Sequence, residues 1–85
     1  MCGPFQCPCC DYFTLDARYD WDICPVCFWE DDVLEADPLN PSPSNHGLTL
    51  AEARANFRLI GACEPAMLEH VCPVPERAAF RYEPR

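Results

Sequence analysis

The chain of 85 residues is long enough for one domain and too short for two. Apolar residues make up 49% of it, but domains this small often need an additional crosslink to be stable. Its eight cysteines suggest that this crosslink is a thiolate-bound metal or a set of disulfides. Its 14 acidic residues face six arginines and no lysine, for a formal net charge of −8. This charge argues against direct binding of nucleic acid and favours a basic protein partner.

Neither a membrane span nor a secretory signal is evident in the sequence. No stretch approaches the roughly 18 apolar residues that a transmembrane helix requires. Residues 1–4 lack the cationic start and apolar run of a signal peptide. We therefore expect a cytoplasmic protein with no membrane partner. Its cysteines would be reduced, so we expect a bound metal rather than disulfides to crosslink the fold.

Two short segments of strand character lie between the cysteine clusters. Residues 12–15 are apolar, aromatic or β-branched, residues 19–23 alternate apolar with acidic side chains, and residues 16–18 can form the turn of a β-hairpin. The alternation predicts a half-buried second strand. Its buried face would present Tyr19, Trp21 and Ile23, and its solvent-exposed face would present Asp20 and Asp22.

A helix is predicted after a proline-rich loop. Thr49 and Glu52 fit a capping box, and Gly61 is a natural helix end, so we expect a helix over 49–60. Its apolar stripe, which we expect to meet Trp21, Ile23 or Phe28, consists of Leu50, Ala53, Phe57 and Ile60. Beyond it the sequence predicts a short helix at 66–71 and an extended tail.

These elements predict a single α+β domain, in which a small zinc-ribbon-like β-hairpin with two CPxC knuckles packs against one helix. The expected parts are a ribbon at 1–37, a loop at 38–47, a helical part at 48–72 and a tail at 73–85.

Two C-P-x-C units, at 7–10 and 24–27, carry the strongest chemical signal. Two-residue spacing lets both sulfurs of a knuckle reach one ion, and two knuckles can complete a tetrahedral shell of four thiolates. Such a shell has no open position for a water molecule and is typical of a structural site rather than an enzyme. The predicted ligands of one structural Zn²⁺ are Cys7, Cys10, Cys24 and Cys27.

The spacing leaves alternatives open. C-P-x-C also occurs in thiol oxidoreductases, although these place one pair at a helix N-terminus in a βαβ unit. Four thiolates can also hold iron. The four further cysteines could be free, disulfide-bonded or a second metal site; they are Cys2, Cys9, Cys63 and Cys72.

The strings CPCC, CPVCFWEDD and LTLAEARANFRLIGAC, between residues 7 and 63, resemble the small bacterial cysteine-rich CPCC family. The resemblance implies zinc binding. Because some members are encoded near toxin genes, it also implies an immunity protein that neutralises a toxin.

We expect Trp29 to be buried beneath the second knuckle, and a run of acidic residues follows it in the sequence. Together with the acidic face of the second strand, this run is the predicted binding surface for a basic partner such as a nucleic-acid-directed toxin. That surface comprises Glu30, Asp31, Asp32, Asp20 and Asp22. The alternative function is thiol redox chemistry or metal handling by the additional cysteines. His46 and His70 have no evident partner, so we expect no catalytic role for them.

Overall fold

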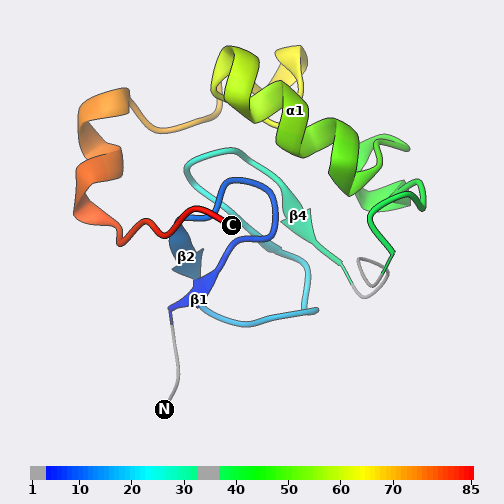
Figure 1. Ribbon diagram of the computed structural model, residues 1–85, viewed down its shortest axis with the longest axis horizontal. Helices are drawn as coiled ribbons and strands as arrows, with labels where there is room; N and C mark the ends of the chain where they lie inside the picture. The colour runs from blue at the N-terminus through cyan, green and yellow to red at the C-terminus, as the bar shows by residue number, and fades with distance from the viewer. Residues whose placement is uncertain (1–3, 33–36) are drawn as a thin grey trace.

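A computed structural model describes residues 4–32 and 37–85 of the chain. It contains two short antiparallel hairpins (Figure 1). Strand β1 (Phe5–Gln6) pairs with β2 (Phe13–Leu15), and β3 (Asp22–Ile23) pairs with β4 (Glu30–Asp31). The hairpin expected between residues 12–15 and 19–23 is therefore wrong. Each C-P-x-C turn reverses the chain, so the strands on either side of one knuckle pair with each other.

The two knuckles are copies of the same turn. In each C-P-x-C unit, the amide of the residue that follows the last cysteine donates a hydrogen bond to the carbonyl of the first cysteine. These bonds run from Asp11 to Cys7 at 3.1 Å and from Phe28 to Cys24 at 2.8 Å. Asp11 and Phe28 both have left-handed backbone, with φ of 70° and 68°. A β-strand–knuckle–β-strand unit thus occurs twice in the first 31 residues.

Helix α1 (Leu50–Ile60) confirms the predicted helix and both of its ends. The Thr49 side chain accepts from the Glu52 amide, the Glu52 side chain accepts from the Thr49 amide, and Gly61 ends the helix in left-handed backbone at φ 83°. Both caps are formed by residues within one turn of the helix ends. Local sequence was therefore sufficient to predict this element.

Elsewhere in the described residues there are three 3-10 helices, η1 (Pro43–Asn45), η2 (Pro65–Met67) and η3 (Val74–Ala79). The predicted short helix at 66–71 is only the single turn η2, and the predicted extended tail contains η3. Proline fits the first turn of a helix, because a backbone N–H at this position would have no acceptor within the helix. The prolines of the tail are therefore compatible with a helical segment, although they favour an extended tail in the sequence.

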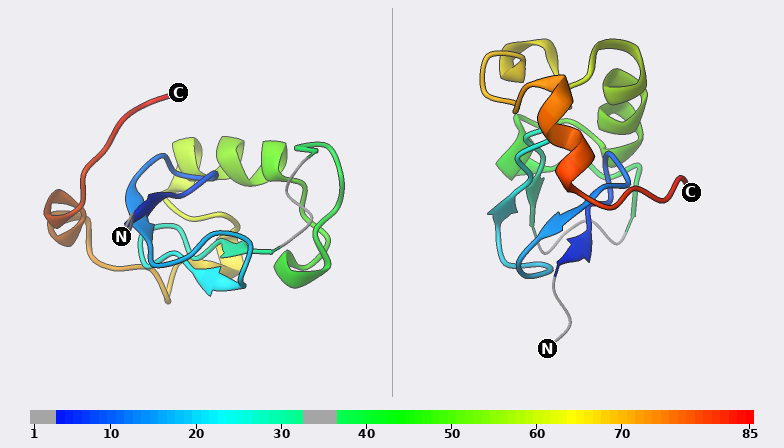
Figure 2. Two further views of the ribbon diagram at one scale, coloured as in Figure 1. Left: turned by 90° about the horizontal axis from the view of Figure 1, so that it is seen from below. Right: turned by 90° about the vertical axis from the view of Figure 1, so that its left-hand side faces the viewer.

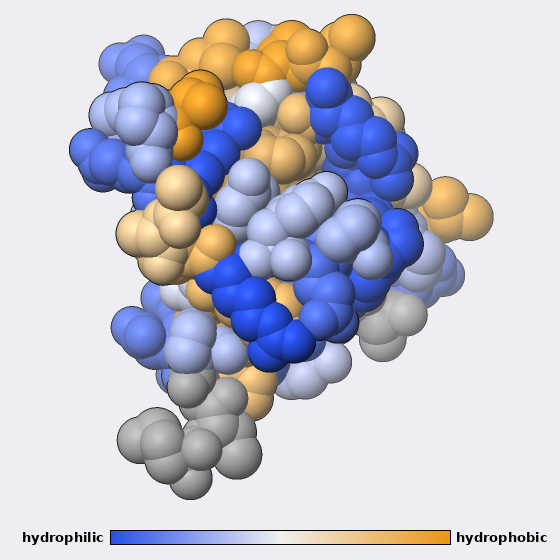
Figure 3. Space-filling view, turned by 60° about the vertical axis from the view of Figure 1, so that its left-hand side comes forward, coloured by the Kyte–Doolittle hydropathy of each residue, from blue (hydrophilic) through white to orange (hydrophobic). Residues whose placement is uncertain are grey.

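Helix α1 forms a layer on one side of the two hairpins, and η3 lies beside them (Figure 2). The C-terminal tail returns to the first hairpin, where Phe13 donates its amide to the Arg81 carbonyl at 2.8 Å and Tyr12 bridges to Tyr82. The face with η3 forward is largely hydrophilic, with apolar residues along its upper edge (Figure 3).

The core lies between the knuckles and α1. Trp29 is 1% exposed, which confirms it as a core residue. Beside the cysteines, the buried apolar side chains of this core cluster are Leu15, Val26, Trp29, Leu50 and Ala53. Within the described ranges, none of the helices has the length and hydropathy that a bilayer crossing requires.

The predicted buried face of the second strand is wrong. Tyr19, Trp21 and Ile23 are 49%, 51% and 42% exposed, so the side of this strand that the alternation predicts to be buried is exposed. Instead, Phe57 meets the ring of Tyr12 edge-on, with ring centroids 6.5 Å apart. The strand β3 has only two residues, and alternation along such a short element does not determine which side is buried.

Candidate metal centre

Four cysteine thiols meet in the core. The Sγ atoms of the four cysteines all lie within 4.8 Å of one another, with 3.6 Å between Cys7 and Cys27 and 3.7 Å between Cys10 and Cys24. A tetrahedral site with Zn–S bonds of about 2.3 Å needs sulfurs about 3.8 Å apart. These residues therefore fit a metal ion, and they are the four that the spacing predicted.

Each knuckle points backbone amides at its sulfurs. The Cys9 amide lies 3.4 Å from Cys7 Sγ, and the Val26 amide lies 3.4 Å from Cys24 Sγ. The Thr14 hydroxyl, from β2, donates to Cys24 Sγ at 3.0 Å. Such donors favour thiolates, which are the form in which cysteine ligates a metal.

Burial and crowding oppose the ionisation of all four thiols at once. Burial raises the pKa of Cys7 and of Cys27, and hydrogen bonding to Cys24 raises the pKa of Cys10. Burial also acts to raise the pKa of Cys24, but hydrogen bonds from the other thiols and from Thr14 outweigh it and lower that pKa. Negative charge is thus favoured at Cys24, and a divalent cation is the group that would allow the other three to ionise.

The other described cysteines lie outside this cluster and are free. Cys9 and Cys63 are 3% and 1% exposed, and Cys72 is half-buried. Burial raises the pKa of Cys63 to about 12, so its thiol is neutral at physiological pH. Across residues 4–32 and 37–85, the four-cysteine group is the one cluster that could hold a metal. Cys2 lies outside the described residues.

The predicted acidic surface is not a single exposed patch. Asp31 and Asp32 are 0% and 2% exposed and are bonded internally, Asp31 to Arg18 Nε at 2.8 Å and Asp32 to the Ser42 hydroxyl at 2.5 Å. Glu30 and Asp22 are half-buried, and Asp20 is exposed. Nothing in the local sequence distinguished the buried carboxylates, because their partners lie ten or more residues away.

The two histidines both have partners. His46 Nδ1 lies 2.7 Å from Glu64 Oε2, and the His70 ring stacks on Phe28 with centroids 5.0 Å apart. Both contacts are long-range in sequence, and for this reason the histidines looked isolated.

The sequence also did not reveal a group of charges beside the first knuckle. Arg54 of α1 donates to the Pro8 carbonyl at 2.6 Å, and Arg85 donates to the Cys7 carbonyl at 3.0 Å. Both guanidinium groups also bond to Asp11, whose pKa they hold below its usual range even though burial acts to raise it. Helix α1 and the tail are thereby fastened to the backbone of the first knuckle.

The comparisons agree with the resemblance read from the cysteine strings. A family model described as Cysteine-rich CPCC matches residues 5–78, a span that includes both knuckles, α1 and most of η3. Comparison with curated proteins and with solved structures found no significant match. Because the family model covers most of the chain, this protein belongs to the cysteine-rich CPCC family.

Proposed function

We propose that this protein is a protein-binding module whose fold is stabilised by one structural zinc ion and whose partner is a basic protein. The observation that carries the structural role is the burial of the ligands. Cys7, Cys24 and Cys27 are 0% exposed and Cys10 is 3% exposed. Four buried protein ligands would leave no open coordination position for a substrate, so the site favours structural stabilisation over catalysis.

Zinc is the proposed metal because the ligand set is four sulfurs within 4.8 Å of one another, two pairs of which lie at separations close to those of a tetrahedral site. Iron is the chemical alternative for four thiolates. Elemental analysis of protein purified from its native cells under reducing conditions decides between them. One zinc per chain supports the proposal, and stoichiometric iron contradicts it.

A strained and exposed aromatic pair supports a binding surface next to the second knuckle. Tyr19 and Trp21 both have left-handed backbone at φ 58°, which is costly for bulky side chains. About half of each side chain is exposed, so core packing does not compensate for this strain. We name Tyr19, Asp20, Trp21 and Ile23 the Trp21 surface and propose it as the partner-binding site, since exposed aromatic residues beside charge are typical of binding hot spots.

The buried carboxylate of Asp31 holds this surface in place. Its Oδ2 accepts from the Tyr19 amide at 2.9 Å and from Arg18 Nε at 2.8 Å, and the Asp31 carbonyl accepts from the Trp21 amide at 2.9 Å. Asp31, which we had expected to touch the partner, is therefore assigned a positioning role. A loop fixed by such bonds loses little conformational freedom on binding.

Charge supports a basic partner. The formal net charge is −8. Four thiolates and one Zn²⁺ would change it to −8 − 4 + 2, which is −10. Such a field speeds encounter with a positively charged protein. With the toxin-linked resemblance, we propose a cytoplasmic immunity protein that neutralises a basic, nucleic-acid-directed toxin and has no enzymatic activity of its own.

Co-purification from native cells with mass spectrometry would identify the partner, and variants then test the surface. Trp21→Ala should weaken binding at least tenfold, and Asp20→Asn should slow association and reduce its salt dependence. Leu59→Ala, an 83% exposed apolar position on α1, is the control and should bind normally. Equal binding by Trp21→Ala and the control would overturn the proposed surface.

The burial of the cysteines outside the cluster favours this proposal over the redox alternative. Cys9 and Cys63 are enclosed, and burial raises the pKa of Cys72, which lowers its thiolate fraction. A thiol–disulfide turnover that is lost in Cys9→Ser would contradict the binding proposal and establish the alternative.

A further inference from the structure

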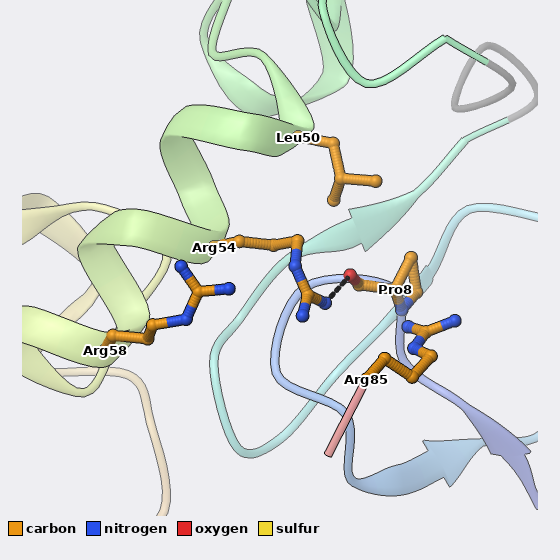
Figure 4. A pocket seen from close by; sticks show the side chains of 5 residues that line it. All are labelled: Pro8, Leu50, Arg54, Arg58 and Arg85. Carbon is orange, nitrogen blue, oxygen red and sulfur yellow. Dashed lines mark hydrogen bonds between the residues drawn. The ribbon is translucent and has the colours of Figure 1, made fainter.

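A groove lined by arginine side chains lies between α1, the first knuckle and the C-terminal tail. It is an open groove of about 420 Å³ lined by Pro8, Leu50, Arg54, Arg58 and Arg85. In Figure 4, Arg54 reaches from α1 to Pro8 of the first knuckle, with Arg58 on one side of this contact and Arg85 of the tail on the other. The groove shares no residue with the Trp21 surface.

Among the charged side chains at this groove, guanidinium groups outnumber carboxylates. Asp11 accepts hydrogen bonds from both Arg54 and Arg85, so one carboxylate serves two guanidinium groups. Arg58 adds a third guanidinium, and no hydrogen bond or ion pair links it to another residue of the described ranges. Arg54 and Arg58 are also four residues apart on one helix, a spacing at which like charges destabilise. A bound anion would relieve this repulsion.

The positive region extends past the groove. A neighbouring hollow of about 300 Å³ is lined by Arg54 and Arg58 again and by Arg77, together with the carboxylate of Asp11. The two hollows together are lined by four of the six arginines of a chain with net charge −8. Arg54, Arg77 and Arg85 each bond to a backbone carbonyl, which gives them a structural role. Arg58 has no such role.

We propose that this groove binds a doubly charged oxyanion, carried by a phosphate ester or a small dicarboxylate, with Arg58 as its principal ligand. Guanidinium groups recognise phosphate and carboxylate oxygens through paired hydrogen bonds. Arg54 and Arg85 are held in place by Asp11 and the knuckle carbonyls, so they form a fixed positive wall for the anion. Leu50 and Pro8 offer apolar contact to the rest of the ligand.

The test is a titration of the metal-loaded full chain with inorganic phosphate, pyrophosphate and malonate, at ionic strength held constant with chloride. Chemical shifts of the backbone amides and of the arginine Nε–H groups report the site. We expect saturable shifts at Arg58 and Leu50. Tighter binding of the phosphates identifies a phosphate ester as the ligand class, tighter binding of malonate identifies a dicarboxylate, and both results uphold the site.

Two variants distinguish anion binding in the groove from a general electrostatic attraction of anions to the protein. Arg58→Gln should weaken binding about tenfold, because it removes charged hydrogen bonds. Arg81→Gln removes the same charge at a 69% exposed position outside the groove and should change the affinity less than about twofold. Metal content and spectral dispersion show that both variants fold. Absence of saturable shifts with all three anions, or equal weakening in both variants, would overturn the proposal.

Discussion

Arg54 donates hydrogen bonds to both carboxylate oxygens of Asp11, with Nη1 2.7 Å from Oδ1 and Nη2 3.1 Å from Oδ2. The two residues are 43 positions apart in the sequence, and the pair joins α1 to the turn of the first knuckle. The Asp11 side chain is only 8% exposed. This contact fixes the orientation of the helix relative to the candidate metal centre, so its strength is worth measuring.

Asp11→Asn should destabilise the protein by about 1.5–3 kcal/mol, the range for hydrogen bonds to charged groups. Asparagine tolerates the left-handed backbone of this position, so the change tests the charge and not the turn. Urea unfolding of the metal-loaded protein measures the effect. Glu83→Gln breaks an exposed pair with Arg81 and should cost less than about 1 kcal/mol. Equal costs would show that the Asp11 pair is no stronger than a surface pair.

The stability difference between wild type and Asp11→Asn should be constant between about pH 6 and pH 8. The arginines lower the pKa of Asp11 in the folded protein, so its stabilisation is complete above the ordinary carboxyl pKa of about 4. It is lost only as the pH falls further, through the lower folded pKa. Urea midpoints at several pH values check this. A difference that changed across this window would mean that another group controls the effect.

Cys24→Ser should abolish stoichiometric metal binding and unfold the residues around both knuckles, because metal binding and folding are coupled in small domains. Cys72→Ser should retain the metal, since Cys72 lies outside the four-cysteine cluster. Metal content after gel filtration and a fingerprint NMR spectrum measure both outcomes. Metal loss in Cys72→Ser would show that the ligand set is wrong.

Phe57→Ala should cost about 2 kcal/mol, below the range of about 3–5 kcal/mol for fully buried phenylalanines, because Phe57 is half-buried. It would lose its contacts with the Tyr12 ring and with the Arg77 guanidinium 5.0 Å above it. Leu59→Ala, on the exposed side of the same helix, should change the stability by less than about 0.5 kcal/mol. A cost below about 1 kcal/mol for Phe57→Ala would contradict packing of α1 into the common core.

Asp31→Asn should cost about 2 kcal/mol or more, because the carboxylate is fully buried and accepts from Arg18 and from the Tyr19 amide. The exposed Asp20→Asn should change the stability by less than about 0.5 kcal/mol. Thermal unfolding of the metal-loaded variants compares them. If both were neutral, Asp31 would not hold the loop that carries Trp21.

The elements that the sequence predicted well depend on local interactions. Thr49, Glu52 and Gly61 form the caps of α1 with neighbours in the chain, and the spacing within each C-P-x-C unit brings its two sulfurs together. Strand pairing was harder to predict. The apolar segments beside the cysteines could pair across the linker or across a knuckle, and both choices satisfy the same hydrophobic pattern.

The four-cysteine cluster, the helix with its ends and the burial of Trp29 follow from the sequence, because short-range geometry and a large apolar side chain leave few alternatives. Which charges are buried and which aromatic residues are exposed depends instead on how distant segments pack together. Asp31 is buried because Arg18 reaches it from a different segment, and Trp21 is exposed on the loop that this contact holds. The arginine groove likewise combines residues 8 and 85, which approach each other only once the tail has folded back. Burial of charge depends on long-range partners, and a linear pattern does not specify them.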